Sequence, residues 1–144
     1  MAQPKQRPLS PHLGIYKWGP HMLVSILHRV TGDGLAILGS SLLVLWLFSA
    51  ASGPECYATF QYYVWKAAEG DVLGLIANIF GRIVLIGLSW AFFQHMLSGL
   101  RHFVMDMGAG YELKANRSWS IATIIISIVL TVLLWAWLLV GRTL

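Results

Sequence analysis

The sequence predicts an all-α integral membrane protein with three transmembrane helices. Of its 144 residues, 57% are hydrophobic and only 11% are charged, which leaves too little polar surface for a water-soluble globule. Three stretches contain no Asp, Glu, Lys or Arg, namely 34–54, 83–100 and 118–141. Each is long enough, with its flanks, to cross about 30 Å of hydrocarbon as a helix. The chain length fits a single domain.

The first 20 residues are predicted to form an extended basic arm. They hold four of the five prolines, which resist helix, together with Lys5, Arg7 and Lys17. The arm has neither the apolar core of a secretory signal nor the character of an amphipathic transit helix. This favours a bacterial inner membrane, with the mitochondrial inner membrane as the alternative. Residues 21–144 are expected to form the three-helix membrane domain.

The three helices are predicted at about 21–51, 71–105 and 118–140. Between the first two, residues 53–71 carry Pro, Gly and many aromatic side chains, so we expect a loop that includes a short interfacial helix. Glycines after the second helix break the chain, and a short polar loop is expected to follow. The third helix has no ionisable residue inside it, which indicates a role in packing.

Basic residues near the ends of the spans predict the orientation. On the side of the N-terminus lie Lys5, Arg7, Lys17, Arg101, Lys114 and Arg117. On the opposite side lie Lys66, Arg82 and Arg142. The more basic side usually faces the cytoplasm, so the N-terminus is expected inside and the C-terminus outside. The net charge of +4 therefore does not indicate a nucleic-acid partner. The lone cysteine excludes an internal disulfide and a multi-cysteine metal site.

Polar residues in the second helix indicate a cofactor site. At about 100° per residue, His95, Gly99, His102 and Asp106 share one face. The helical rise puts the two imidazoles roughly 10 Å apart, too far to bind one metal ion together. His95 is a candidate axial ligand of a haem iron, with a glycine gap that lets a flat ring lie close to the backbone. The alternative is a histidine that hydrogen-bonds a neighbouring helix.

A second polar cluster lies in the first helix, where Ser25, His28 and Arg29 are three and four residues apart. A hydroxyl and a guanidinium can hydrogen-bond the carbonyl oxygens of a quinone, and cations also suit haem propionates. The alternative is an interfacial Arg29–Asp33 ion pair without further function. Both clusters are expected at the same depth toward the inner side. The second axial histidine must come from another chain, because His102 is too near the surface and the third helix offers none.

Two sequence motifs resemble the signatures of the succinate dehydrogenase cytochrome b556 family. The first comprises Arg7-Pro8-Leu9 and then Ser25-Ile26-Leu27-His28-Arg29-Val30-Thr31-Gly32. The second comprises His95, Gly99-Leu100-Arg101-His102 and Asp106. Both match without a gap or a substituted key position, and they fall on the expected helices.

The resemblance implies one of two membrane anchors of a succinate:ubiquinone oxidoreductase, which serves the tricarboxylic acid cycle and the electron transport chain. FAD and iron–sulfur clusters would belong to flavoprotein and iron–sulfur partner subunits, and haem b would lie between this chain and a second anchor. By resemblance His95 is the axial ligand, with the second ligand from the partner anchor, and Ser25 and Arg29 bind ubiquinone. Residues implied near the haem propionates are His28, Arg29 and His102. Asp106 is implied in proton uptake.

Three alternatives compete with this interpretation. The first is the anchor of a fumarate reductase, which runs the reverse reaction with a different quinone. The second is a purely structural anchor without haem or quinone, and the pairing of a deep His95 with Gly99 speaks against it. The third is a small transporter or channel subunit. Its polar residues would have to form a continuous path, whereas those of this chain are confined to one side. Apart from membrane lipid, the expected partners are thus the other subunits and ubiquinone.

Overall fold

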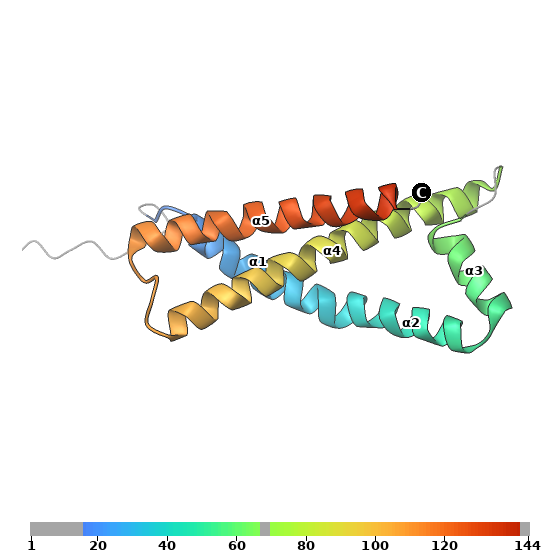
Figure 1. Cartoon of the computed structure of the whole chain (residues 1–144), viewed down its shortest axis with the longest axis horizontal. Helices are drawn as coiled ribbons and strands as arrows, with labels where there is room; N and C mark the ends of the chain where they lie inside the picture. The colour runs from blue at the N-terminus through green and yellow to red at the C-terminus, as the bar shows by residue number, and fades with distance from the viewer. Residues whose placement is uncertain (1–15, 67–69, 142–144) are drawn as a thin grey trace, which may run out of the picture.

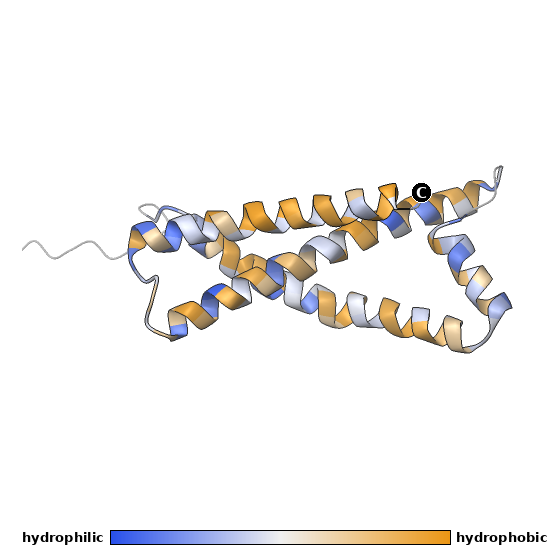
Figure 2. Cartoon of the chain, in the orientation of Figure 1, coloured by the Kyte–Doolittle hydropathy of each residue, from blue (hydrophilic) through white to orange (hydrophobic). Residues whose placement is uncertain are grey.

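The computed structural model of the chain describes residues 16–66 and 70–141, and all regular structure in these ranges is helical. Three helices are long and apolar enough to cross a membrane, namely Pro20–Ala51, Val72–Asp106 and Leu113–Val140. This confirms the predicted all-α class with three candidate spans. The helices form an elongated bundle (Figure 1) that is apolar along most of its length (Figure 2). Residues 1–15 of the predicted basic arm lie outside the described ranges.

The first span consists of two halves with different neighbours. It begins with α1 (Pro20–Gly34), passes through a π-helical turn (Leu35–Gly39), and continues as α2 (Ser40–Ala51). Pro20 suits the first helical turn, because its fixed φ is pre-organised and its missing N–H needs no partner there. Helix α1 crosses α4 and also packs on α5, whereas α2 diverges and packs on α3 (Figure 1).

A short helix, α3 (Pro54–Val64), connects the first two spans, in agreement with the expected helix within that loop. Gly53 makes the turn into it with a φ of 105°, a conformation that favours glycine. At its other end, Asn78 of α4 donates from Nδ2 to the carbonyl oxygens of Tyr62 (2.7 Å) and Tyr63 (3.0 Å). These bonds satisfy carbonyls that a helix end leaves without an intrahelical partner. Asn78 therefore joins the end of α3 to α4.

Asp71, just before α4 (Val72–Asp106), accepts a hydrogen bond from the Tyr62 hydroxyl. This bond, and further ones from the backbone N–H groups of Gly74 and Leu73, lower the pKa of the Asp71 carboxyl. The carboxyl therefore remains ionised down to lower pH. Its negative charge stabilises α4, because it lies next to the positive end of the helix dipole. The contribution of this carboxylate to folding stability is present above the ordinary pKa of an aspartate. It is lost only as the pH falls through the lowered pKa of Asp71.

Helix α5 (Leu113–Val140) begins five residues earlier than the predicted start at 118. Lys114 and Arg117, expected in a polar loop, are therefore helical. A helix that leaves the hydrocarbon no longer needs apolar side chains, and Lys, Ala and Arg are good helix formers. The connection from α4 turns at Gly108 and Gly110, whose φ values are 86° and 82°.

Most buried side chains in the described part of the chain are small and polar. On α5 they form one face that consists of Ser120, Thr123, Ser127 and Thr131. Three of them, Ser120, Thr123 and Thr131, donate to a carbonyl of their own helix at 2.7–2.8 Å. The hydroxyl of Ser127 lies 2.8 Å from both the carbonyl oxygen of Ile124 and Oε1 of Gln94 on α4. Small residues let membrane helices approach closely, and apolar faces can be left to lipid. The buried apolar side chains of the described part are Val24 and Ala91. The bundle is therefore held by small-residue contacts rather than by an apolar core.

Candidate functional site

Three imidazoles from two helices meet where α1 crosses α4. The ring of His28 on α1 stacks on that of His95 on α4, with centroids 4.0 Å apart and an interplanar angle of 7°. His102, two turns further along α4, meets the His28 ring edge-on, with centroids 5.4 Å apart. The two polar clusters that the sequence places on separate helices thus lie together at one crossing.

His95 is tied to the backbone of α1 through one ring nitrogen. Its Nδ1 lies 3.0 Å from the carbonyl oxygen of His28 and 3.4 Å from Oγ1 of Thr31. Because a carbonyl oxygen only accepts, Nδ1 must carry the proton and donate it. In a neutral imidazole the other nitrogen, Nε2, then holds a lone pair. A backbone carbonyl of this kind commonly orients a metal-ligating histidine.

His28 is oriented in the same way by a buried serine. Its Nδ1 lies 2.7 Å from Oγ of Ser98, which is fully buried. The Ser98 hydroxyl donates its own hydrogen bond to the carbonyl oxygen of Gln94, at 2.7 Å. With that proton engaged, Oγ is free to accept from Nδ1 of His28, and Nε2 of His28 then lies outside this bond.

Two glycines lie against these rings. A Cβ at Gly32 would stand 2.8 Å from Cε1 of His95, closer than side chains tolerate. A Cβ at Gly99 would stand 3.8 Å from Cε1 of His28, which is ordinary contact. The glycine that makes room for the His95 ring is therefore Gly32, which sequence reasoning missed. The available signal was its position four residues after His28, on the same face of α1.

The remaining predicted site residues surround this crossing more loosely. Ser25 is half-buried on α1, while Arg29 is exposed on the isolated chain. His102 is also exposed, as is Asp106, the last residue of α4. The C-terminal end of α4, whose last residue is Asp106, lies at the end of the bundle where α1 begins (Figure 1).

Arg101, which belongs to the second sequence motif, faces away from the histidines. It is 7% exposed and donates from Nη2 to Oδ1 of Asn116 on α5 at 2.5 Å. Its position in the motif thus corresponds to a link between α4 and α5.

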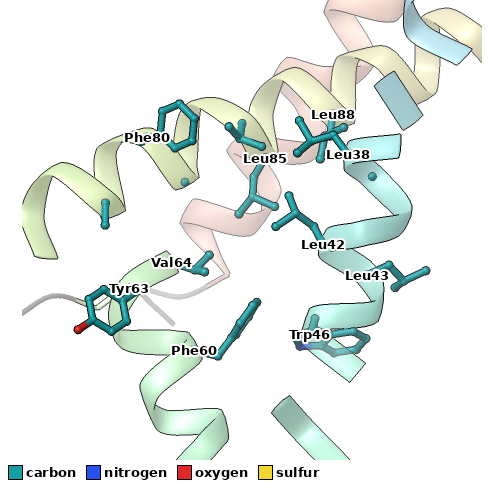
Figure 3. A pocket seen from close by; sticks show the side chains of 14 residues that line it. Leu38, Leu42, Leu43, Trp46, Phe60, Tyr63, Val64, Phe80, Leu85 and Leu88 are labelled. Atoms are coloured by element: carbon teal, nitrogen blue, oxygen red, sulfur yellow. The ribbon is translucent and has the colours of Figure 1, made fainter. Parts of the chain in front are cut away.

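A large apolar cavity lies at the other end of the bundle, where α2 and α4 diverge. It has a volume of about 540 Å³ and is walled by α2, α3 and α4, with Trp46, Phe60 and Phe80 among its lining side chains (Figure 3). None of the predicted site residues lines it. The histidine crossing is therefore separate from this cavity.

Comparison with known proteins decides the family. The family model described as "Succinate dehydrogenase/Fumarate reductase transmembrane subunit" matches residues 3–134. The chain belongs to this family. It is 35% identical over 127 residues to the succinate dehydrogenase cytochrome b556 subunit of Paracoccus denitrificans, covering 88% of each chain. The same subunit of Rickettsia felis is 33% identical over 130 residues, covering 90% of this chain and 91% of that one.

A mitochondrial relative is similar over the same region. The succinate dehydrogenase cytochrome b560 subunit of Mus musculus is 31% identical over 122 residues, which is 85% of this chain and 66% of the mouse protein. The resemblance stated from the two motifs is thereby confirmed. The chain is a transmembrane subunit of the succinate dehydrogenase/fumarate reductase family.

The hydrogen bond between Ser98 and His28 is expected to stabilise the crossing in this transmembrane subunit. Ser98→Ala leaves Nδ1 of His28 without its acceptor, which should destabilise the fold by about 1–3 kcal/mol. The measurement is the thermal unfolding midpoint of the purified complex. Ser41→Ala is the matched control, because Ser41 also donates to the carbonyl four residues before it, at 2.6 Å, but is exposed. Equal midpoints for the two variants would contradict this role.

Proposed function

We propose that this chain is one of two membrane anchors of a succinate:ubiquinone oxidoreductase. It holds haem b together with the second anchor and contributes to the site of ubiquinone reduction. The observation that carries this proposal is the His95 ring, whose Nδ1 is 3.0 Å from the carbonyl oxygen of His28 and whose Nε2 therefore keeps its lone pair. The family adds support to this proposal, because bacterial relatives of the chain are named cytochrome b556 subunits.

The residues at the crossing suit a haem. His95 would be an axial ligand through Nε2, and the second axial histidine would come from the partner anchor. When bound, the haem supplies a one-electron redox centre. Arg29 and His102 would donate to the propionates, and so would His28 when its ring carries a proton on both nitrogens. The His28 ring stacks at 4.0 Å on His95 and lies 5.4 Å from His102. Gly32 and Gly99 have no side chain that would occupy the space beside the His95 and His28 rings.

Ser25 and Arg29 would bind ubiquinone. They lie one helical turn apart on α1, so a hydroxyl and a guanidinium can donate to the same carbonyl oxygen. Arg29 is exposed on this chain alone, as expected for a group that also faces other subunits. Asp106, exposed at the same end, would help to bring in the protons that quinone reduction consumes. Succinate oxidation would take place on the flavoprotein partner, and electrons would arrive through the iron–sulfur partner.

The N-terminus would face the inside of a bacterial inner membrane, and the C-terminus the outside. The count of basic residues supports this orientation, with six on the side of the N-terminus and three opposite. In that orientation the histidine crossing lies toward the inner side.

The anchor of a fumarate reductase is the nearest alternative, since the family description covers both enzymes. The two differ in the direction of electron flow, which depends on potentials set largely by partner subunits. A purely structural anchor is disfavoured, because histidines at membrane depth are costly unless they are used.

Replacing His95 tests the haem assignment. His95→Ala removes the proposed ligand, so the complex should lose most of its haem or show an altered reduced-minus-oxidised spectrum of the b type. His21→Ala is the control, because His21 is an exposed histidine at the start of the same bundle. An unchanged spectrum in His95→Ala would contradict the assignment.

The quinone site is tested by Ser25→Ala and Arg29→Ala. Loss of a hydrogen bond to a charged group is worth about 1.5–3 kcal/mol, so ubiquinone reduction should fall by roughly 10-fold or more in Arg29→Ala. Succinate oxidation with an artificial dye should persist, because the dye bypasses this site. An equal loss of both activities would instead assign these residues a structural role.

The orientation can be measured with two exposed serines at opposite ends of the bundle. In a Cys56→Ala background, Ser52→Cys lies before α3 and Ser118→Cys lies near the start of α5. A membrane-impermeant maleimide added to intact spheroplasts should label position 52, and label position 118 only after lysis. The reverse pattern would place the N-terminus outside.

A further inference from the structure

We infer that Gly32 is the residue that positions the His95 ring, and with it the direction of Nε2. This inference rests on the proposed role of His95 as a haem ligand. The ring lies directly over the place where a side chain at position 32 would begin. An ideal Cβ there would be 2.8 Å from Cε1, 3.2 Å from Nδ1 and 3.8 Å from Nε2 of His95. The edge of the ring that carries both nitrogens therefore faces the backbone of α1 at Gly32.

The absence of a side chain at position 32 also leaves the carbonyl oxygen of His28 accessible to the hydrogen bond from His95. In an α-helix the carbonyl of residue 28 accepts the N–H of residue 32, so Gly32 lies directly over the carbonyl oxygen of His28. That oxygen accepts a second hydrogen bond from Nδ1 of His95, at 3.0 Å. A methyl group at position 32 would stand 3.2 Å from Nδ1, the nitrogen that donates this bond.

The His95 ring has little room to yield to such a methyl group. Nδ1 holds it to the His28 carbonyl, Oγ1 of Thr31 is 3.4 Å from the same nitrogen, and the His28 ring stacks 4.0 Å away. The 2.8 Å contact is about 0.6 Å shorter than the 3.4 Å at which ordinary van der Waals contact begins. Metal–ligand distances in a sound site hold to within about 0.2 Å. A shift of the ring large enough to relieve the contact would therefore misplace the ligand.

A second glycine of α1 provides a matched comparison. Of the described residues, none comes within 4 Å of a Cβ built at Gly34, which is two positions further along the same helix. Both glycines are helical, so replacement by alanine favours the helix to a similar extent at each. The difference between the two variants therefore reports the contact with His95 alone.

The experiment compares Gly32→Ala with Gly34→Ala in the complete complex. The readouts are haem per flavin, the rate of haem loss to an excess of apomyoglobin, the reduced-minus-oxidised spectrum, and the midpoint potential. Disturbing a group that orients a metal ligand commonly weakens the metal site 10- to 100-fold. We expect Gly32→Ala to lose haem at least 10-fold faster, with an altered spectrum and potential, and Gly34→Ala to match the unmodified complex. Identical behaviour of the two variants overturns the inference.

A double-variant cycle covers the case in which Gly32→Ala fails to assemble. If the methyl group clashes only with the His95 ring, adding Gly32→Ala to His95→Ala should not reduce assembly further. Failure of the double variant, where His95→Ala alone assembles, also overturns the inference. The proposed function is tested separately by the spectrum of His95→Ala. That variant can lose its haem while Gly32→Ala behaves normally, so the two failures are distinguishable.

Discussion

The hydrogen bond from Nδ1 of His95 to the carbonyl oxygen of His28 joins the two spans that carry the candidate site. In hydrocarbon an imidazole N–H has no water to bond, so it must find an acceptor within the protein. The acceptor here is a backbone carbonyl that already belongs to a helix, and glycine at position 32 leaves it accessible. The tautomer of His95, and with it the lone pair on Nε2, depends on this bond, which also joins α1 to α4.

The rest of the bundle follows the same requirement. Polar side chains that face neighbouring helices donate their protons to nearby carbonyls, as Ser120, Thr123 and Thr131 on the buried face of α5 do. Where a polar group reaches across to another helix, it fixes a contact between spans. Ser127 donates to Oε1 of Gln94 at 2.8 Å, and Trp135 donates from Nε1 to Oγ of Ser89 at 3.3 Å. Such bonds act together with close small-residue packing to hold α5 on α4.

The three spans could be predicted from the sequence because the length and charge of a membrane helix are dictated by the bilayer. The early start of α5 could not, since the segment around Lys114 is polar and only its helix propensity favours helix there. The grouping of His28 with His95 and His102 was accessible from their spacing on two helices and their expected depth. The hydrogen-bond partners were not, because Ser98 and the carbonyl of His28 become neighbours only through the crossing angle. Gly32 is part of the first motif, but its contact with the His95 ring could not be predicted for the same reason.

The π-helical turn at Leu35–Gly39 has a consequence for how this subunit can vary. A π turn holds one residue more than the α-helical turn that it replaces, so it acts as a one-residue insertion inside a continuous helix. The face of the second half is consequently rotated by about 100° from its place in an unbroken α-helix. His28 and Gly32 face α4 before the turn, and a lipid-compatible segment follows it. The part of the cavity wall that α2 supplies therefore lies on the far side of a one-residue offset from the half that carries His28 and Gly32.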